Sequence, residues 1–214
     1  MKLFALFAIA AALFAPKEAG SIAPVFHGSV SRIDAGTRAR MVGSSWHPGC
    51  PVRIRNLRLL KLDYWGYDGS VHRGRMVVNA RQAAHVVTVF RKLFYAHFQI
   101  RRMRLIDVYG ADDDRSLAAN NTAAFNCRFV AGTSRWSMHA YGLAVDINPV
   151  QNPYVNGSHA SPPAGRAYLD RTRHATGMIH AGDVVVRAFA SVDWEWGGYW
   201  SWPTDYQHFS SNGR

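Results

Sequence analysis

Residues 137–146 read SMHAYGLAVD and place the imidazole of His139 seven residues before the carboxylate of Asp146. Gly142 and Ala144 between them are small, which suits a turn that leads into a strand. Such a turn can bring the two side chains to one point. A His and an Asp at this spacing are more often structural than metal-binding when nothing else accompanies them. The stretch therefore needs a partner elsewhere in the chain.

That partner is DYQHF near the C-terminus, in which Asp205 and His208 are three residues apart. Together, His139, Asp146 and His208 offer three nitrogen and oxygen ligands for a zinc ion, with a fourth position left for water. Asp205 would face that water as the general base. In the alternative interpretation, Asp205 orients His208 instead.

Four further features near these two stretches could contribute to the site, as substrate contacts, as an alternative base or as part of the pocket wall. Arg128 carries a guanidinium that can clamp a carboxylate through two hydrogen bonds. Ser137 can hydrogen-bond substrate or cap a turn. Glu195 is a competing base, although its tryptophan neighbours favour a position at the rim. The tryptophans between Trp194 and Trp202 are expected in the core and the pocket wall, and could also stack on sugar rings.

Length and composition indicate a single exported domain. The chain has 214 residues, of which 48% are hydrophobic, enough for a substantial core. Residues 3–15 form an apolar run that is short for a membrane span and suits a secretory signal. We therefore assign residues 1–23 to a signal peptide or an N-terminal membrane anchor, and residues 24–214 to one domain. The protein is then expected to be secreted, periplasmic or associated with the cell wall.

The cysteines and the charge agree with that compartment. Cys50 and Cys127 lack the spacing of a metal-binding pair, and in an exported chain they predict a disulfide, whereas two buried free thiols would suit the cytoplasm. A net charge of +11 indicates affinity for a polyanion. The basic residues are scattered without a nucleic-acid-binding motif, so an anionic cell-wall polymer is the better match and no nucleic acid is expected.

Hydrophobic patterns predict an α+β fold. Residues 57–64 and 74–78 flank a turn-rich segment and predict a β-hairpin. Residues 80–97 carry a helical apolar stripe, with Asn79 as the expected cap, and predict the main helix. Residues 103–109 predict a strand.

Weaker signals complete this picture. Residues 22–49 are expected to form an extended arm, and the three aspartates at 112–114 a solvated loop. Residues 148–165 form a proline-containing loop long enough for a lid. Asp183 is expected to cap a short helix. We predict a small antiparallel sheet with one long helix and shorter helices packed against it, and a zinc cleft on the sheet.

The two motifs carry a resemblance to a known family. SMHAYGLAVDIN resembles the S-x-H-x-x-G-x-A-x-D signature, and DYQHF the closing carboxylate-x-x-His signature, of the zinc D-alanyl-D-alanine carboxypeptidase-like family. These bacterial cell-wall peptidases include L-alanyl-D-glutamate endopeptidases and resemble the Hedgehog signalling domain in fold. A weaker likeness extends back to the region of Cys50. By resemblance, one Zn²⁺ would be bound by His139, Asp146 and His208, with Asp205 as base and Arg128 and Ser137 as substrate contacts.

The resemblance implies a zinc metallopeptidase, expected as a monomer, that hydrolyses peptidoglycan stem peptides. The base is Asp205 here, whereas carboxypeptidase and dipeptidase members use Glu. This difference favours the endopeptidase branch. It does not identify which peptide bond is hydrolysed. The alternative is a non-catalytic, zinc-stabilised module that binds the cell wall or signals as Hedgehog does. The presence of Asp205 favours the enzyme.

Overall fold

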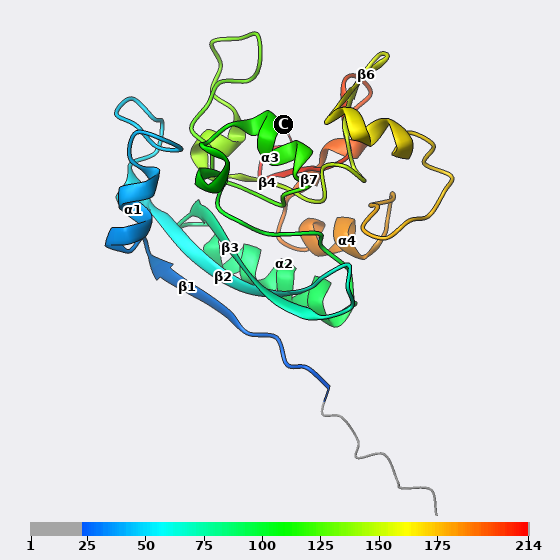
Figure 1. Cartoon of the computed structure of the whole chain (residues 1–214), viewed down its shortest axis with the longest axis horizontal. Coiled ribbons are helices and arrows are strands. Elements are labelled where there is room, and N and C mark those ends of the chain that lie inside the picture. The colour runs from blue at the N-terminus through cyan, green and yellow to red at the C-terminus, as the bar shows by residue number, and fades with distance from the viewer. Residues whose placement is uncertain (1–22, 214) are drawn as a thin grey trace, which may run out of the picture.

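The computed structural model describes residues 23–213. The expected signal peptide or anchor therefore lies outside the described residues, except for its last residue. Helices and small antiparallel sheets make up the fold, which gives the predicted α+β class (Figure 1). None of the helices between residues 23 and 213 has both the length and the apolar character needed to cross a bilayer.

Residues 23–213 form three separate three-stranded antiparallel sheets, so the prediction of one small sheet is wrong. The first sheet contains β1 (Gly28–Arg32), β2 (Leu57–Trp65) and β3 (Val71–Asn79), in that order. The second has the order β4 (Ala144–Asp146), β9 (His208–Ser210) and β7 (Glu195–Trp196). The third has the order β6 (His159–Ser161), β5 (Tyr154–Asn156) and β8 (Thr204–Asp205).

The predicted hairpin is confirmed as β2 and β3, which pair from Leu57 with Asn79 to Trp65 with Val71. Strand β2 contributes buried residues to both faces of this sheet, whereas β1 is exposed. Leu60 and Leu62 on one face join the larger hydrophobic cluster, and Leu57 and Leu59 on the other join a second cluster. Because successive strand residues point to opposite faces, burial on both sides explains why β2 is apolar without strict alternation.

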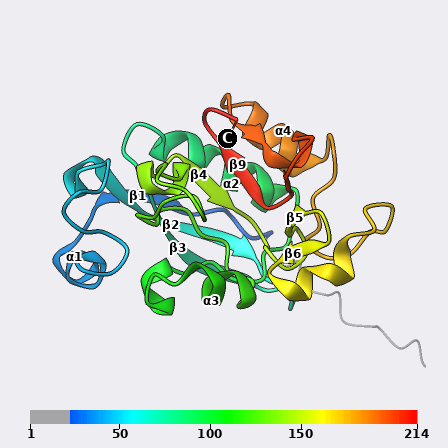
Figure 2. The ribbon, with the colours of Figure 1, turned by 90° about the horizontal axis from the view of Figure 1, so that it is seen from above.

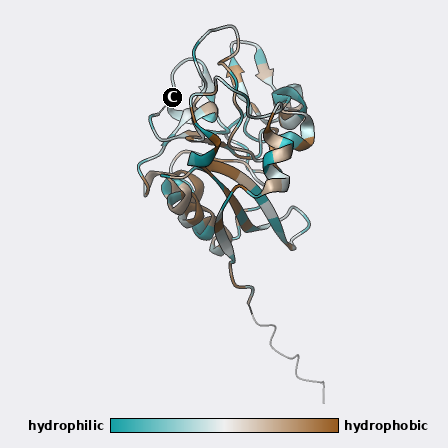
Figure 3. Cartoon of the chain, turned by 90° about the vertical axis from the view of Figure 1, so that its left-hand side faces the viewer, coloured by the Kyte–Doolittle hydropathy of each residue, from teal (hydrophilic) through white to brown (hydrophobic). Residues whose placement is uncertain are grey.

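The main helix is α2 (Ala83–Tyr95), shorter at both ends than the predicted 80–97. Its buried face includes Phe90 and Leu93 and covers one side of the first sheet (Figures 1 and 2). Apolar residues gather where the helix and the sheet face each other (Figure 3). Burial of a side chain such as Phe90 contributes about 3 kcal/mol. Asn79 does not cap α2, because it ends β3 and its side-chain amide donates to Tyr141 O at 3.0 Å.

Two further local predictions are wrong. Residues 22–49 contain β1 and also α1 (Ala35–Met41), which Asp34 caps by accepting a hydrogen bond from Thr37 N at 2.7 Å. The strand predicted at 103–109 is absent from the described structure. Met103 makes one isolated bridge, and a 3₁₀ turn, η2 (Ile106–Tyr109), follows and ends at Gly110 with a φ of 72°.

The aspartate run and the proline loop are also more ordered than expected. Asp112 caps α3 (Asp113–Ala118), so the run begins a helix instead of forming a loop. The 148–165 segment contains the β5–β6 hairpin and leads into η4 (Pro163–Tyr168). Asp183 caps α4 (Val184–Ala190) as predicted. Short 3₁₀ turns η1 (Ile54–Asn56), η3 (Met138–Tyr141) and η5 (Gly197–Tyr199) complete the fold.

Candidate metal centre

His139 lies in the 3₁₀ turn η3, which the local sequence specifies at both ends. Ser137 Oγ accepts a hydrogen bond from His139 N at 3.3 Å, and Gly142 ends the turn with a φ of 67°. Glycine is required here because a Cβ atom at this position would also lie 2.6 Å from Asn79 N. Asn79 N donates to Gly142 O at 2.9 Å. The turn therefore fixes His139 against the end of β3.

The strand pair β4–β9 brings the two motifs together. These strands are antiparallel, with Asp146 opposite His208 and Val145 opposite Phe209 (Figure 2). Val145 and Phe209 are fully buried in the main core. Since neighbouring strand residues point to opposite faces, Asp146 and His208 lie side by side on the other face. Residues 62 positions apart thus meet through the register of one short ladder.

The donor atoms of the three candidate ligands lie close together, with one carboxylate oxygen of Asp146 facing each imidazole. His139 Nε2 lies 3.1 Å from Asp146 Oδ2, and His208 Nδ1 lies 3.1 Å from Asp146 Oδ1. The two imidazole nitrogens are 3.3 Å apart. A tetrahedral zinc ion with bonds of about 2.0 to 2.1 Å separates its ligand atoms by roughly 3.3 to 3.4 Å. The separation of the two imidazole nitrogens therefore matches that of two zinc ligands, and each nitrogen has a carboxylate oxygen of Asp146 at a similar distance.

The chemistry of these donors also fits a cation. His139 Nδ1 donates to Ala124 O at 2.5 Å, so a neutral imidazole presents the lone pair of Nε2. That lone pair faces Asp146 Oδ2, which is also an acceptor. A cation between the two atoms removes this conflict. A histidine that donates its second ring nitrogen to a backbone carbonyl is a common arrangement in metal sites.

All three side chains are buried, which makes their charges interdependent. Burial by itself would raise the pKa of Asp146, but neighbouring His139 and His208 hold the pKa of this carboxyl well below its ordinary value. A carboxylate buried beside two imidazoles needs compensating positive charge. A proton or a metal ion supplies it.

Asp205, the predicted base, lies on β8 beside this cluster. Its Oδ1 atom is buried and has no hydrogen-bond partner among residues 23–213. Burial raises the pKa of Asp205 to about 6; His208 opposes this rise and Asp146 adds to it. Backbone pairing with Tyr154 holds the strand in place. A buried carboxyl with a raised pKa is suited to accept and release a proton near neutral pH.

Arg128 and Ser137 occupy different environments. Arg128 Nη2 pairs with Asp113 Oδ2 at 2.7 Å, and both side chains are about a third exposed. Asn126 donates its backbone N–H to His139 O at 3.2 Å. Arg128 therefore follows, two residues later, a segment that is hydrogen-bonded to the residue of a candidate ligand. Ser137 is buried and caps the turn that carries His139. Their roles as substrate contacts stay predictions.

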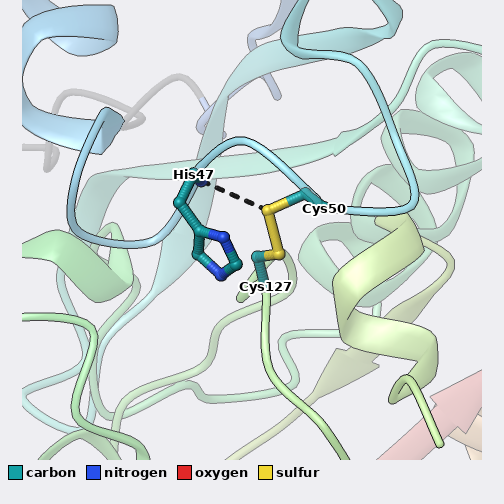
Figure 4. A group of neighbouring side chains, drawn as sticks. All are labelled: His47, Cys50 and Cys127. Carbon is teal, nitrogen blue, oxygen red and sulfur yellow. Dashed lines mark hydrogen bonds between the residues drawn. A yellow bond between two sulfur atoms is a disulfide. The ribbon is translucent and has the colours of Figure 1, made fainter.

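A second group, formed by His47, Cys50 and Cys127, has atoms close enough together for a metal (Figure 4). Its two sulfur atoms are joined, however, which confirms the predicted disulfide and excludes the alternative of free thiols. His47 N donates to Cys50 Sγ at 3.2 Å. Because metals bind thiolates, the closed disulfide leaves His47 without sulfur ligands beside it.

Sequence reasoning missed several groups around the centre. Ala124 orients His139 through its carbonyl, which every residue carries, so no sequence signal marks it. Trp200 has its ring centroid 5.4 Å from that of His208. The sequence shows the cluster of tryptophans, but it does not show which tryptophan contacts a candidate metal-binding residue. Tyr154 lies opposite Asp205 only because β5 and β8 pair, and strands this short leave no pattern.

Comparison with known families agrees with the two motifs. Residues 131–211 match the family model described as D-alanyl-D-alanine carboxypeptidase. This segment is less than half of the chain, yet it includes all three candidate ligands and Asp205. The resemblance indicated by the motifs is thus confirmed over the part of the chain that forms the centre, and it supports a peptidase. No curated protein and no solved structure matches the chain.

Proposed function

We propose that this protein is a zinc metallopeptidase that hydrolyses peptide bonds in peptidoglycan stem peptides. One observation carries the proposal: His139, Asp146 and His208 converge within 3.3 Å of one another beside the buried carboxyl of Asp205. The family match over residues 131–211 supports the substrate class.

In this proposal, His139 Nε2, the Asp146 carboxylate and His208 Nδ1 hold the ion. Bound zinc supplies a Lewis acid that polarises a carbonyl and makes water more acidic. Asp146 offsets part of the positive charge, and the Ala124 carbonyl keeps His139 in the tautomer that presents Nε2. The buried position of these ligands excludes bulk water and strengthens their electrostatic interactions.

Asp205 acts as the general base. It accepts a proton from the attacking water and transfers it to the amine that leaves when the peptide bond breaks. The raised pKa of about 6 suits both steps, because the carboxylate is mostly ionised at pH 7 and still takes up a proton readily. The unpartnered Oδ1 atom, considered within the described chain, is the atom that would accept this proton.

Arg128 and Ser137 contact substrate in this proposal. A guanidinium recognises a carboxylate, and stem peptides carry carboxylates both at their ends and along their length. Both an endopeptidase and a D,D-carboxypeptidase therefore remain compatible with Arg128. An aspartate base favours the endopeptidase.

The proposed site of action is outside the cytoplasm, in the periplasm or at the cell wall. The Cys50–Cys127 disulfide supports this location, since such bonds persist in oxidising compartments. A net charge of +11 would attract the protein to anionic wall polymers, and we propose that it acts there as a monomer.

Purified protein incubated with cell-wall sacculi and with defined muropeptides tests the proposal. We expect peptide fragments to be released, a chelator to stop the release, and added zinc to restore it. Asp205→Asn should lower kcat by about 100-fold or more while the protein still binds zinc. Glu195→Gln is the matched control, because this exposed carboxylate is the competing base and should be dispensable.

Two outcomes would contradict the proposal. Full activity in Asp205→Asn would contradict the assignment of Asp205 as the general base. A purified protein that binds no metal would contradict the zinc-dependent mechanism. If the protein binds sacculi without releasing products, and if His139→Ala unfolds it, the protein is a zinc-stabilised module that binds the cell wall. Mass spectrometry of the muropeptide products identifies the bond that is cut.

A further inference from the structure

Two aromatic side chains, one on either side in sequence of Trp200, which contacts His208, are unusually exposed. Tyr199 is 62% exposed and Trp202 is 65% exposed, the highest values among the large hydrophobic residues of the described chain. Apolar side chains of this size normally lose contact with water on folding. Exposed aromatics next to a candidate catalytic site therefore indicate a surface that a ligand covers.

Tyr199 and the neighbouring backbone at Trp200 are held by contacts with the rest of the fold. The ring of Tyr199 packs edge-on against buried Trp196, with centroids 5.1 Å apart. Thr204 Oγ1 donates to the carbonyl of Trp200 at 3.2 Å. Trp200 in turn lies against His208. The 199–202 segment thus presents one exposed aromatic on either side in sequence of Trp200, which contacts a proposed metal ligand.

The β5–β6 hairpin forms the other part of this surface. Its tip and the 199–203 loop lie side by side at the upper right of Figure 1. A Cβ atom at Gly157 would lie 3.4 Å from the Trp202 ring, so the hairpin tip lies close to the indole. Asn156 and Ser158 at the tip are exposed. Amide and hydroxyl groups are therefore close to the aromatic faces.

Charge indicates what kind of ligand this surface suits. Neither residues 154–161 nor residues 197–203 contain Asp, Glu, Lys or Arg, although the chain as a whole has a net charge of +11. An anionic polymer or a peptide carboxylate would find no Lys or Arg within these segments, whose one basic side chain is the exposed imidazole of His159. A neutral ligand with apolar faces and polar edges fits them better, and pyranose rings have this character.

We propose that Tyr199 and Trp202 bind neutral sugar rings of the glycan strand to which the substrate peptide is attached. The C–H face of a sugar ring stacks on each aromatic ring, and Asn156 and Ser158 hydrogen-bond its hydroxyl or acetamido groups. The linked peptide then passes Trp200 to reach His208. This inference rests on the proposed function, because it names a second part of the same substrate.

The first test measures binding of a sugar without a peptide. Tryptophan fluorescence and calorimetry with a β-1,4-linked N-acetylglucosamine tetrasaccharide should show binding by the full-length wild-type protein. We expect Trp202→Ala and Tyr199→Ala each to weaken this binding at least about tenfold, with unchanged Tm because both side chains are exposed. Tyr95→Ala is the matched control, since Tyr95 is 56% exposed on α2 and should not affect binding.

The second test compares two substrates with the same peptide, one attached to a disaccharide and one free. We expect wild type to favour the attached form about tenfold in kcat/KM, and Trp202→Ala to lose this preference. Unchanged preference in Trp202→Ala, or a wild type that does not bind the tetrasaccharide, overturns the sugar site. Equal losses on both substrates would overturn it too, because they would assign Trp202 to the peptide. A wild type that binds the tetrasaccharide but cleaves neither substrate supports the sugar site and contradicts only the peptidase.

Discussion

Asp146 on β4 lies directly across the strand ladder from His208 on β9, with His208 Nδ1 3.1 Å from Asp146 Oδ1. The register of this ladder therefore decides whether the two side chains share a face. A slip of one residue would turn His208 towards the core and bring Phe209 to the candidate centre. The geometry of these two candidate ligands therefore depends directly on the pairing register of β4 and β9.

Removal of the β9 ligand should abolish tight metal binding. His208→Ala leaves only two ligands, so we expect zinc affinity to fall by more than about 100-fold. Competition with a chromophoric chelator measures this change. His85→Ala, which removes an exposed imidazole on α2, serves as the control and should keep wild-type affinity. Equal affinity in His208→Ala would show that the metal binds elsewhere.

Gly142→Ala should destabilise the turn that carries His139. Gly142 has a φ of 67°, and a Cβ atom would lie 2.6 Å from Asn79 N, so both backbone strain and a clash arise. We expect a loss of about 2 to 4 kcal/mol in the free energy of unfolding, measured with urea, and weaker zinc binding.

Gly132→Ala separates these two causes. Gly132 also has a positive φ, 74°, but its Cβ position is open. This variant should lose only about 1 kcal/mol. Equal losses in the two variants would mean that contact with Asn79 contributes nothing.

Asp63 should make stability depend on pH in the acid range. It is buried on β2, where Arg73 Nε donates to it at 2.8 Å and His27 N at 2.9 Å. Burial opposes ionisation, but these hydrogen bonds outweigh it and lower the pKa of Asp63. A lowered pKa in the folded state stabilises the protein above the unfolded value of about 3.9, and this contribution is lost as the pH falls through the folded value.

Asp63→Asn should therefore be less stable than wild type by about 1 to 3 kcal/mol at pH 7. Urea unfolding between pH 2 and pH 7 should show the difference shrinking below about pH 4. A difference that stays constant over this range would show that the charge of Asp63 does not stabilise the fold.

Loss of the disulfide should lower stability strongly. Cys50 and Cys127 are 77 residues apart, and a loop of this length restricts the unfolded chain by about 4 kcal/mol. We expect the double variant Cys50→Ala/Cys127→Ala to have a lower Tm by several degrees. A dithiol reductant should lower the Tm of wild type towards that of the variant and leave the variant unchanged. An equal response of both proteins to reductant would contradict a role for the bond.

The sequence predicted those elements that have a long pattern or a strong local signal. The hairpin β2–β3 and the helix α2 are long enough to show periodicity, and Asp183 marks the start of α4. The second and third sheets were not predicted, because strands of two or three residues have no readable period. Their pairing depends on contacts between distant segments.

The candidate centre was predictable to the extent that its side chains have distinctive chemistry. Histidines and aspartates in two motifs identified the cluster, and the structure brings His139, Asp146 and His208 together. The supporting groups are a backbone carbonyl at Ala124 and an aromatic ring at Trp200, which resemble many others in the chain. Only the folded arrangement distinguishes them.

The position of β9 in the chain has a consequence for biosynthesis. A growing polypeptide has already produced His139 and Asp146 when its ribosome is still more than sixty residues short of His208. The β4–β9 ladder cannot form until residues 208–210 have left the ribosomal exit tunnel. An unfinished or still unfolded chain therefore lacks the complete candidate ligand set, and the proposed activity requires that synthesis and folding have both passed β9.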